Sequence, residues 1–331
     1  MPAATPPLNV AVLGCWHVHA KDYARSAAAH PGTTLVAVWD RDPELGRPLA
    51  QEFGVEHTDD LDALLARDDV HAVTVTTETT AHTEVISAAL AAGKHVFTEK
   101  LLAPTVEECE RLIALAADAG LALVVSLPRL YHGYALAVHE VLESGSLGPL
   151  TYARVRLSHD GAVHGRDHGE GGWLPDRFFD PVPSVGGALT DLGCHPVYLT
   201  QWFLGADPRT VRAVYASLTP RAVEDHAVVT VGYDDGRIGV IEAGFVSNDA
   251  FTIDVHGTEG SIHYTDQDAR LWRRWPDGKV EDLEVPADAP DAFGQWVGHA
   301  VDGTRAIDNL ERAVELTRLV VRANTAAGGS K

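Results

Sequence analysis

The chain has 331 residues, of which 45% are hydrophobic, and a formal net charge of −21 at pH 7. The length allows two domains, while the negative charge, with no basic cluster to offset it, argues against nucleic acid or an anionic membrane as a partner. No apolar run is long enough to span a membrane, the N-terminus lacks the features of a signal peptide, and the three cysteines lie far apart. We therefore expect a cytoplasmic protein with unpaired thiols that acts on a small molecule.

The first 128 residues alternate short apolar runs with amphipathic segments, which is the pattern of a parallel sheet covered by helices. The spacing of Thr105 and Glu108 predicts a capping box at the start of one helix. We expect strands at 8–13, 34–39, 72–77, 94–98 and 121–126, and helices at 43–53, 61–65, 82–92 and from 105 to 120. This order predicts a doubly wound α/β domain over residues 1–128.

The pattern changes after residue 128, where strands follow one another with few helices between them. We expect a helix at 134–142, strands at 151–158, 211–219, 227–233, 238–246, 251–256, 261–264 and 271–275, and closing helices at 291–302 and 309–326. Residues 129–331 are thus predicted to form an α+β domain on an open, mostly antiparallel sheet. The weak alternation over 227–231 suggests burial on both faces, so we expect a homodimer or homotetramer joined through this sheet.

The turn after the first strand is a candidate binding site for a pyrophosphate. Gly14 ends the apolar run and an amphipathic segment follows, so helix N–H groups are expected to point at a ligand. The dinucleotide fingerprint requires glycine at three positions, and here Trp16 and His19 occupy the second and third. An ordinary strand-to-helix turn is the alternative.

The end of the second strand carries an acidic residue that suits a ribose. Asp40 is placed to accept hydrogen bonds from both ribose hydroxyls of an adenosine, which favours NAD. The alternative is a simple helix-capping aspartate before Pro43. Arg41 could serve a 2′-phosphate, but the neighbouring carboxylate opposes that use.

Two motifs carry a family resemblance: EKLLA at residues 99–103 and GGALTDLGCH at residues 186–195. With these motifs the chain resembles the Gfo/Idh/MocA oxidoreductases, two-domain nicotinamide enzymes that act on sugars, inositols and related polyols. The resemblance implies Lys100, Asp191 and His195 as catalytic residues. Leu101 and Glu78 stand where proline is usual, which mainly concerns backbone rigidity.

The resemblance and the strand-end positions together imply two sets of binding residues. We expect the amides around residues 16–18 to remain free for phosphate, with the Trp16 indole turned aside. The expected cofactor-binding residues are Gly14, Trp16, His17, Val18, Asp40, Arg41, Thr77, His82 and Glu99. The expected substrate-binding residues are Arg129, Tyr131, His159 and Trp173.

Each catalytic assignment has a plainer alternative. The Lys100 ammonium would stabilise a developing alkoxide, or it is a solvated lysine or half of an ion pair with Glu99. Asp191 and His195 are four residues apart, so on one helix they would share a face, and a neutral imidazole can take an alcohol proton. Pro196 should kink or restart that helix. The alternative is a buried histidine satisfied by Asp191.

Histidines also crowd a glycine-rich segment that follows the strand at 151–158. His159, His164 and His168 could ligate a metal, but no helix sets their spacing and no cysteine assists. We expect a mobile substrate loop there and no metal. Trp173 could stack on a sugar ring or fill a gap in the core.

These observations predict an NAD-dependent dehydrogenase that oxidises a secondary alcohol of a sugar, glycoside or cyclitol by hydride transfer to nicotinamide. One alternative is a hydrolase or lyase that retains its NAD and oxidises the substrate only transiently. Another is a nonenzymatic sensor of NAD or sugar built on the same fold.

Overall fold

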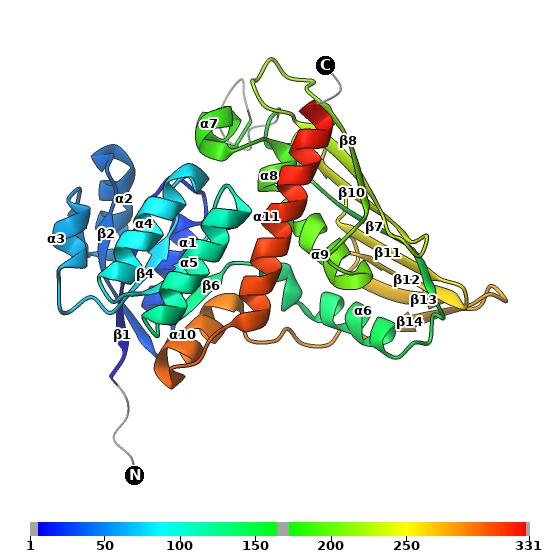
Figure 1. Cartoon of the computed structure of the whole chain (residues 1–331), viewed down its shortest axis with the longest axis horizontal. Helices are drawn as coiled ribbons and strands as arrows, with labels where there is room; N and C mark the ends of the chain where they lie inside the picture. The colour runs from blue at the N-terminus through cyan, green and yellow to red at the C-terminus, as the bar shows by residue number, and fades with distance from the viewer. Residues whose placement is uncertain (1–5, 164–171, 329–331) are drawn as a thin grey trace, which may run out of the picture. The chain divides into compact units, whose positions relative to one another are not determined.

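The computed structural model describes residues 6–163 and 172–328, which form two compact units (Figure 1). The first unit comprises residues 1–126 and 290–314, and the second comprises residues 127–289 and 315–331. The expected change of architecture near residue 128 is present, but the chain does not stay in the second unit to its end. Residues 290–314, expected in the second domain, belong to the first unit.

The first unit is built on a six-stranded parallel sheet in the order β3-β2-β1-β4-β5-β6. This is the strand order of doubly wound dinucleotide-binding domains, and the topological switch lies between β1 and β4. The short polar strand β3 escaped prediction because it carries no apolar run. The strands are β1 (Leu8–Leu13), β2 (Thr33–Trp39), β3 (Glu56–Thr58), β4 (Ala72–Val75), β5 (His95–Thr98) and β6 (Leu123–Val125).

Five helices connect these strands: α1 (Ala20–Ala29), α2 (Pro43–Phe53), α3 (Leu61–Leu65), α4 (Thr79–Ala91) and α5 (Val106–Asp118). The predicted capping box is confirmed, because Thr105 Oγ1 accepts the Glu108 amide proton at 3.2 Å and donates to Glu108 Oε2 at 2.9 Å. Gly54 ends α2 in the left-handed conformation that favours glycine.

Residues 290–314 return to the first unit and pack against β5 and β6. Phe97 on β5 packs edge-on against Tyr23 of α1 and Phe293 of α10 (Ala292–Asp302), with ring centroids 5.0 and 5.5 Å apart. Asn309, near the start of α11 (Ile307–Gly328), completes the hydrogen bonding of the edge strand β6. Its side chain accepts the Val125 amide proton at 2.8 Å and donates to the Val125 carbonyl at 2.9 Å.

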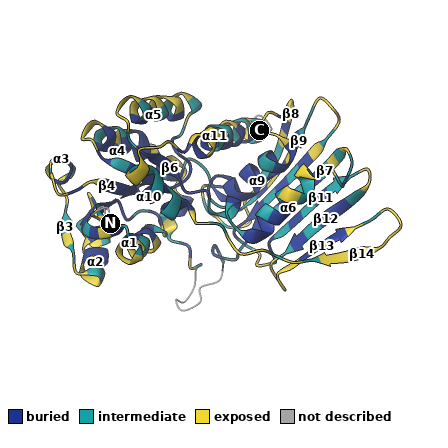
Figure 2. Ribbon diagram, turned by 90° about the horizontal axis from the view of Figure 1, so that it is seen from below, coloured by how far each residue is buried: buried dark blue, intermediate teal, exposed yellow. Residues whose placement is uncertain are grey.

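The second unit is built on an eight-stranded sheet in the order β14-β13-β12-β11-β7-β10-β9-β8. All neighbours are antiparallel except β7 and β10, which pair in parallel. The edge strand β14, which was not predicted, is polar and largely exposed (Figure 2). The strands are β7 (Leu150–Ser158), β8 (Thr210–Ala216), β9 (His226–Gly232), β10 (Ile238–Gly244), β11 (Thr252–Gly257), β12 (Gly260–Thr265), β13 (Arg270–Arg274) and β14 (Val280–Leu283). The predicted fold class is confirmed for both units.

Among the described residues, helices pack on one face of this second sheet, while the other face carries exposed side chains. The helices of the unit are α6 (Gly133–Glu143), α7 (Pro181–Ser184), α8 (Ala188–Asp191), α9 (Cys194–Leu204) and the later part of α11, with short 3₁₀ turns at η1 (Pro128–Leu130) and η2 (Asp176–Phe179). On the outer face Val214, Val228 and Ile238 are exposed. In the single chain Val228 and Thr230 of β9 are exposed, so the expected burial of both faces, which would require a partner subunit, stays a prediction.

The three cysteines, Cys15, Cys109 and Cys194, are buried and form no disulfide with one another in the described part of the chain. Among the helices of residues 6–163 and 172–328, none combines the length and the hydropathy that crossing a bilayer requires.

Candidate functional site

The turn after β1 is held tightly against the loop after β4. Gly14 has φ +87°, and a Cβ there would lie 2.5 Å from Thr77 Cγ2 and 2.7 Å from the Thr77 nitrogen. Only glycine fits this backbone and this approach. Thr76 Oγ1 donates to the Gly14 carbonyl, and the His17 amide donates to the Thr76 carbonyl at 3.0 Å. The two loops at the topological switch thus form one hydrogen-bonded unit.

The amides of this turn are used differently from the prediction. The His17 amide was expected to be free for phosphate, and this is wrong because it donates to Thr76. The His19 amide donates to His17 Nδ1 at 3.2 Å, and α1 begins only at Ala20. Without the second and third glycines, the turn folds back on itself before the helix starts. Roles of Trp16 and Val18 in cofactor binding stay predictions.

Asp40 lies at the carboxyl end of β2 and is almost fully buried. Its Oδ2 accepts the Cys15 amide proton at 2.6 Å and its Oδ1 accepts the Asp42 amide proton at 2.7 Å. The helix that follows is capped by Asp42, which accepts from the Glu44 amide, so Asp40 is not the capping aspartate. Because a carboxylate offers about four lone-pair sites, both Asp40 oxygens can still accept ribose hydroxyls.

Arg41 forms an ion pair across the loops after β2 and β4. Its Nη1 lies 3.3 Å from Glu78 Oε1, with the arginine exposed and the glutamate more enclosed. Glu78, which stands where proline is usual, therefore pairs with the charge of Arg41, the residue that follows Asp40.

Glu99 and Lys100 follow β5 and are both buried, which excludes the solvated-lysine alternative. Glu99 Oε2 accepts the Lys100 amide proton at 3.0 Å, while Glu99 Oε1 accepts from the Tyr23 hydroxyl and lies 2.7 Å from His19 Nδ1. Burial raises the pKa of Glu99, but His17, His19 and Lys100 outweigh it and hold that pKa well below its usual value. Glu99 is thus a buried anion next to the turn that follows β1.

His82 links the loops after β4 and β5. Its Nδ1 lies 2.8 Å from the carbonyl of Leu101 and its Nε2 lies 3.2 Å from the carbonyl of Thr77. Burial lowers the pKa of His82, which favours the neutral ring. The peptide bond between Lys100 and Leu101 is cis. These contacts position the two loops, and direct cofactor contact by His82 stays a prediction.

Donor atoms suitable for a metal gather once among the described residues, where His17, His19 and Glu99 offer ligand atoms within 4.8 Å of one another. The positive N-terminal end of α1 and the nearby Lys100 oppose a cation at this place. Two groups already converge on Glu99 Oε1, which further disfavours metal ligation. His164 and His168, weighed above as metal ligands, lie outside the described residues.

In the second unit, Asp191 and His195 do not share one helix. Asp191 is the last residue of α8 and His195 is the second residue of α9, so the expectation of one shared helical face is wrong. The break lies at Leu192 and Gly193, before Pro196, which sits in the first turn of α9 where proline is tolerated. A Cβ at Gly193 would lie 2.8 Å from Leu189 Cα, so glycine permits this tight corner.

The His195 ring is buried against Tyr198. His195 Nδ1 lies 2.9 Å from the Tyr198 hydroxyl, which also accepts the Arg129 amide proton at 3.1 Å. Burial holds the pKa of Tyr198 well above its usual value, so the phenol stays neutral. Sequence reasoning missed Tyr198, although its position three residues after His195 on a helix is a usable signal.

His159 follows β7 and stands in an aromatic setting near Asp191. Its ring stacks on Phe245, with centroids 5.0 Å apart and planes at 14°, and lies 4.7 Å from the Trp173 ring. His159 Nδ1 accepts the Gly161 amide proton at 3.0 Å, so the neutral ring carries its proton on Nε2. Burial lowers the pKa of His159, while the charge of Asp191 raises it. The structure thus brings together three predicted site residues, His159, Trp173 and Asp191.

Arg129 and Tyr131 have largely structural contacts. The Arg129 guanidinium donates to the Tyr134 hydroxyl at 3.0 Å and lies 4.2 Å above the Phe251 ring. The Tyr131 carbonyl accepts the Ala289 amide proton at 2.9 Å. Their roles toward substrate stay predictions.

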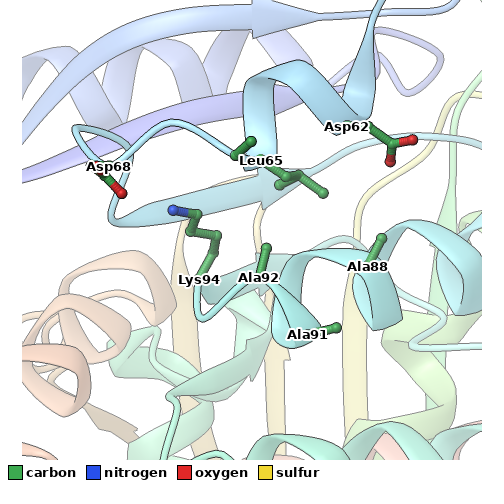
Figure 3. Close-up of a pocket in the computed structure, with 8 residues that line it drawn as sticks. Asp62, Leu65, Asp68, Ala88, Ala91, Ala92 and Lys94 are labelled. Atoms are coloured by element: carbon green, nitrogen blue, oxygen red, sulfur yellow. The ribbon is translucent and has the colours of Figure 1, made fainter.

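A separate hollow of about 510 Å³ lies between α3 and α4 of the first unit (Figure 3). Lys94, which donates to the Arg67 carbonyl at 2.9 Å, lines it together with Leu65, Asp68 and a row of alanines. Lys94 precedes β5 whereas Lys100 follows it, so this hollow lies at the opposite edge of the sheet from the predicted site. Open α/β sheets bind ligands at the carboxyl edge, so we assign no role to the hollow.

Comparison with known families matches both units. Residues 8–127 match the family described as "Oxidoreductase family, NAD-binding Rossmann fold". Residues 135–263 match the "GFO/IDH/MocA C-terminal domain".

Individual proteins resemble the chain over most of its length. It is 29% identical to a dTDP-3,4-didehydro-2,6-dideoxy-alpha-D-glucose 3-reductase of Streptomyces antibioticus, over 95% of this chain and 98% of that protein. It is 30% identical to a 1,5-anhydro-D-fructose reductase of Ensifer adhaerens, over 73% of this chain and 72% of that protein. A crystal structure of GenD2 from gentamicin A biosynthesis, in complex with NAD, matches with a TM-score of 0.83 and 27% identity, covering 99% of this chain and 96% of that one.

Proposed function

Because the chain belongs to the Gfo/Idh/MocA oxidoreductase family, we propose that it is an NAD-dependent dehydrogenase acting on a secondary alcohol of a sugar, glycoside or cyclitol. One observation carries the proposal: the buried Glu99–Lys100 pair lies at the carboxyl edge of a doubly wound sheet, next to the turn that follows β1. Relatives named for a keto sugar, levoglucosan and inositol support a ring carbon as the reacting centre.

The residues at the sheet edge fit a dinucleotide. Gly14, at which a Cβ would collide with Thr77, lets the turn after β1 approach the loop after β4 closely, and Asp40 presents a carboxylate at the end of β2. Among solved structures similar to this chain, one is in complex with NAD and another with NADP, so the similarity does not distinguish between the two cofactors. We assign NAD, because Asp40 would repel a 2′-phosphate and Arg41 is already paired with Glu78.

Three residues carry the proposed chemistry. Bound nicotinamide would supply the acceptor for the hydride that leaves the carbinol carbon. The Lys100 ammonium donates to the hydroxyl oxygen and stabilises the negative charge that develops there. His195 takes the hydroxyl proton on Nε2, which requires its other nitrogen to carry a proton donated to the Tyr198 oxygen. Asp191 orients the proton acceptor or a substrate hydroxyl.

The test is turnover of defined polyols. The full chain is incubated with NAD⁺ and myo-inositol, levoglucosan or methyl glucosides, and with NADH and 1,5-anhydro-D-fructose, and NADH absorbance is followed. We expect a change with at least one substrate, and a loss of at least about a hundredfold in Lys100→Met. Absence of NAD binding by calorimetry would overturn the assignment.

The same assay separates the alternatives of another class. Product formation without net NADH would identify a hydrolase or lyase that retains NAD. Binding of NAD and sugar without any product would identify a sensor. The presence of Lys100, Asp191 and His195 at all three catalytic positions that the resemblance implies favours an enzyme over a sensor.

We further infer a homodimer or homotetramer that packs through the outer face of the second sheet. Val214 and Val228 are cross-strand neighbours there, and both are exposed in the single chain. Arg154, Glu242 and Asp254 form an ion-pair network on the same face. Exposed β-branched residues next to fixed charges suit a self-complementary interface. Its test is light scattering of wild type against Val214→Lys, which should shift the mass to the monomer.

We also propose a cytoplasmic location, which is supported by three buried cysteines that form no disulfide with one another.

A further inference from the structure

The segment that ends in Asp191 is held by one distant residue. The amides of Gly187 and Leu189 both donate to Glu224 Oε1 at 3.1 Å, and the Ala188 amide donates to the Glu224 carbonyl at 3.0 Å. Three successive N–H groups at the start of α8 therefore bind a single residue in the approach to β9. A helix of four residues is not stable alone, so its place depends on such contacts.

Glycine at position 187 is required by the same arrangement. A Cβ there would lie 2.2 Å from the Glu224 carbonyl oxygen and 2.8 Å from Glu224 Oε2. Any side chain at Gly187 would therefore push Glu224 away from the start of α8. The double glycine in the stretch 186–195 thus has a structural reason in this chain.

Asp225, the residue that follows Glu224, links this part of the chain to the surroundings of His159. The carboxylate of the buried Asp225 accepts the amide protons of Leu218 and Thr219 at 2.8 and 2.7 Å, which fixes this part of the chain. The Asp225 carbonyl accepts the Phe245 amide proton at 2.8 Å, and the Phe245 ring stacks on His159. Residues 224–225 thus connect α8, which carries Asp191, to the ring that supports His159.

We propose that Glu224 is a positioning residue, which by accepting the amide protons at the start of α8 sets the place of Asp191, the last residue of α8, relative to His159. The positioning role can be tested without substrate, and only its expected effect on turnover rests on the proposed function. The side chain needs to be an acceptor of the right length, while its charge is secondary. In accord with this, burial raises the pKa of Glu224, although the amide hydrogen bonds oppose the shift.

The first experiment needs no substrate. The pKa of the His159 ring is measured by NMR titration of the full chain, with its signal assigned by loss in His159→Gln. Asp191→Asn should lower the His159 pKa, because an opposite charge nearby favours the protonated ring. Glu224→Ala should lower it equally, and the double variant should lower it no further.

Comparison of two substitutions separates position from charge. Glu224→Gln and Glu224→Ala both remove the negative charge, but only alanine removes the acceptor. We expect the glutamine variant to retain the wild-type His159 pKa. Equal lowering in both variants, or no change in alanine, would overturn the proposal.

Two further variants guard against simple unfolding. Glu224→Asp keeps the charge but is one methylene shorter, so it should behave like alanine if it leaves the fold intact by circular dichroism. Glu242→Ala, which removes a glutamate on the outer face of the same sheet, is the matched control and should leave the His159 pKa unchanged. A lowered His159 pKa in this control would contradict the assignment to Glu224.

Turnover provides the second readout. Misplacement of Asp191 in Glu224→Ala should reduce kcat by about ten- to a hundredfold with unchanged NAD affinity, and Glu224→Gln should restore most of it. If the NMR result holds while kcat is unaffected in an active enzyme, the positioning role stands and the proposed catalytic role of Asp191 falls.

Discussion

In the first unit the candidate residues at the sheet edge follow a strand by one or two positions, whereas in the second unit Asp191 and His195 lie on two consecutive helices held by distant contacts. Gly14, Asp40 and Glu99 directly follow β1, β2 and β5. Their location is a consequence of a parallel sheet, whose strands all end at one edge. Glu224 and Asn324, by contrast, bind α8 from places far along the chain.

This difference between the two units predicts which substitutions should disturb the candidate residues of each. In the first unit a substitution at the edge changes a functional group but leaves the strands in register, because the core strands are buried. In the second unit the loss of one hydrogen-bonding partner moves a segment that carries a functional group. Catalytic effects from residues that touch no substrate are therefore expected mainly in the second unit.

The largest effect is expected from Lys100→Met in the first unit. Loss of the ammonium should lower kcat by about a hundredfold or more, because charge on the reacting oxygen is no longer stabilised. NAD affinity by calorimetry should remain nearly unchanged. The matched control is Lys94→Met at the other end of β5, which should keep normal turnover. Near-normal turnover in Lys100→Met would remove this lysine from the mechanism.

Glu99→Gln should change the dependence of stability on pH. The depressed pKa of Glu99 means that its ionised form stabilises the fold above the ordinary glutamate pKa, and this stabilisation is lost as pH falls toward the folded pKa. Wild type should therefore lose more unfolding free energy on acidification than Glu99→Gln. Urea unfolding at neutral and acidic pH measures this, with the exposed Glu107→Gln as control. Parallel losses in wild type and Glu99→Gln would show that Glu99 is not held ionised.

Cofactor preference tests the ion pair between two strand-end loops. NADP should bind at least about tenfold more weakly than NAD, a difference of about 1.4 kcal/mol, because a 2′-phosphate meets Asp40. Glu78→Gln should release Arg41 and improve NADP binding by about two- to fivefold. Adding Arg41→Ala should abolish that gain. Equal dissociation constants for NAD and NADP in wild type would contradict the assignment.

A smaller effect is expected from Tyr198→Phe in the second unit. Removing the hydroxyl beside His195 Nδ1 should lower kcat by about three- to tenfold, the usual range for one neutral hydrogen bond. Tyr233→Phe, whose hydroxyl donates to the Gly205 carbonyl, serves as control and should not change kcat. An unchanged rate in Tyr198→Phe would mean that His195 needs no orienting partner.

The smallest effect is expected from Trp16→Gly. If the indole turns aside, wild type binds NAD in the micromolar range, about −8 kcal/mol, and glycine changes this only modestly. Calorimetry on protein stripped of cofactor measures both affinities. Absence of NAD binding in wild type together with its recovery in Trp16→Gly would show that the indole blocks the site.

Much of the architecture could be read from sequence because its signals are local. Apolar runs located the strands of the first sheet, and the capping box at Thr105 was confirmed atom by atom. The polar strands β3 and β14 were missed, since they pair at sheet edges and bury little. The parallel pairing of β7 with β10 also has no local signal, because it joins strands that are distant in sequence.

Local sequence patterns were enough to predict the fold class, the residues at the carboxyl edge of the first sheet and the family to which the chain belongs. Periodicity, turn chemistry and strand ends are all short-range properties, and a parallel sheet converts them into a site. Three features became apparent only in the folded chain: residues 290–314 return to cover β5 and β6, the His17 amide donates to Thr76, and α8 ends before His195. These outcomes depend on packing and hydrogen bonding between distant segments, which no local pattern of residues encodes.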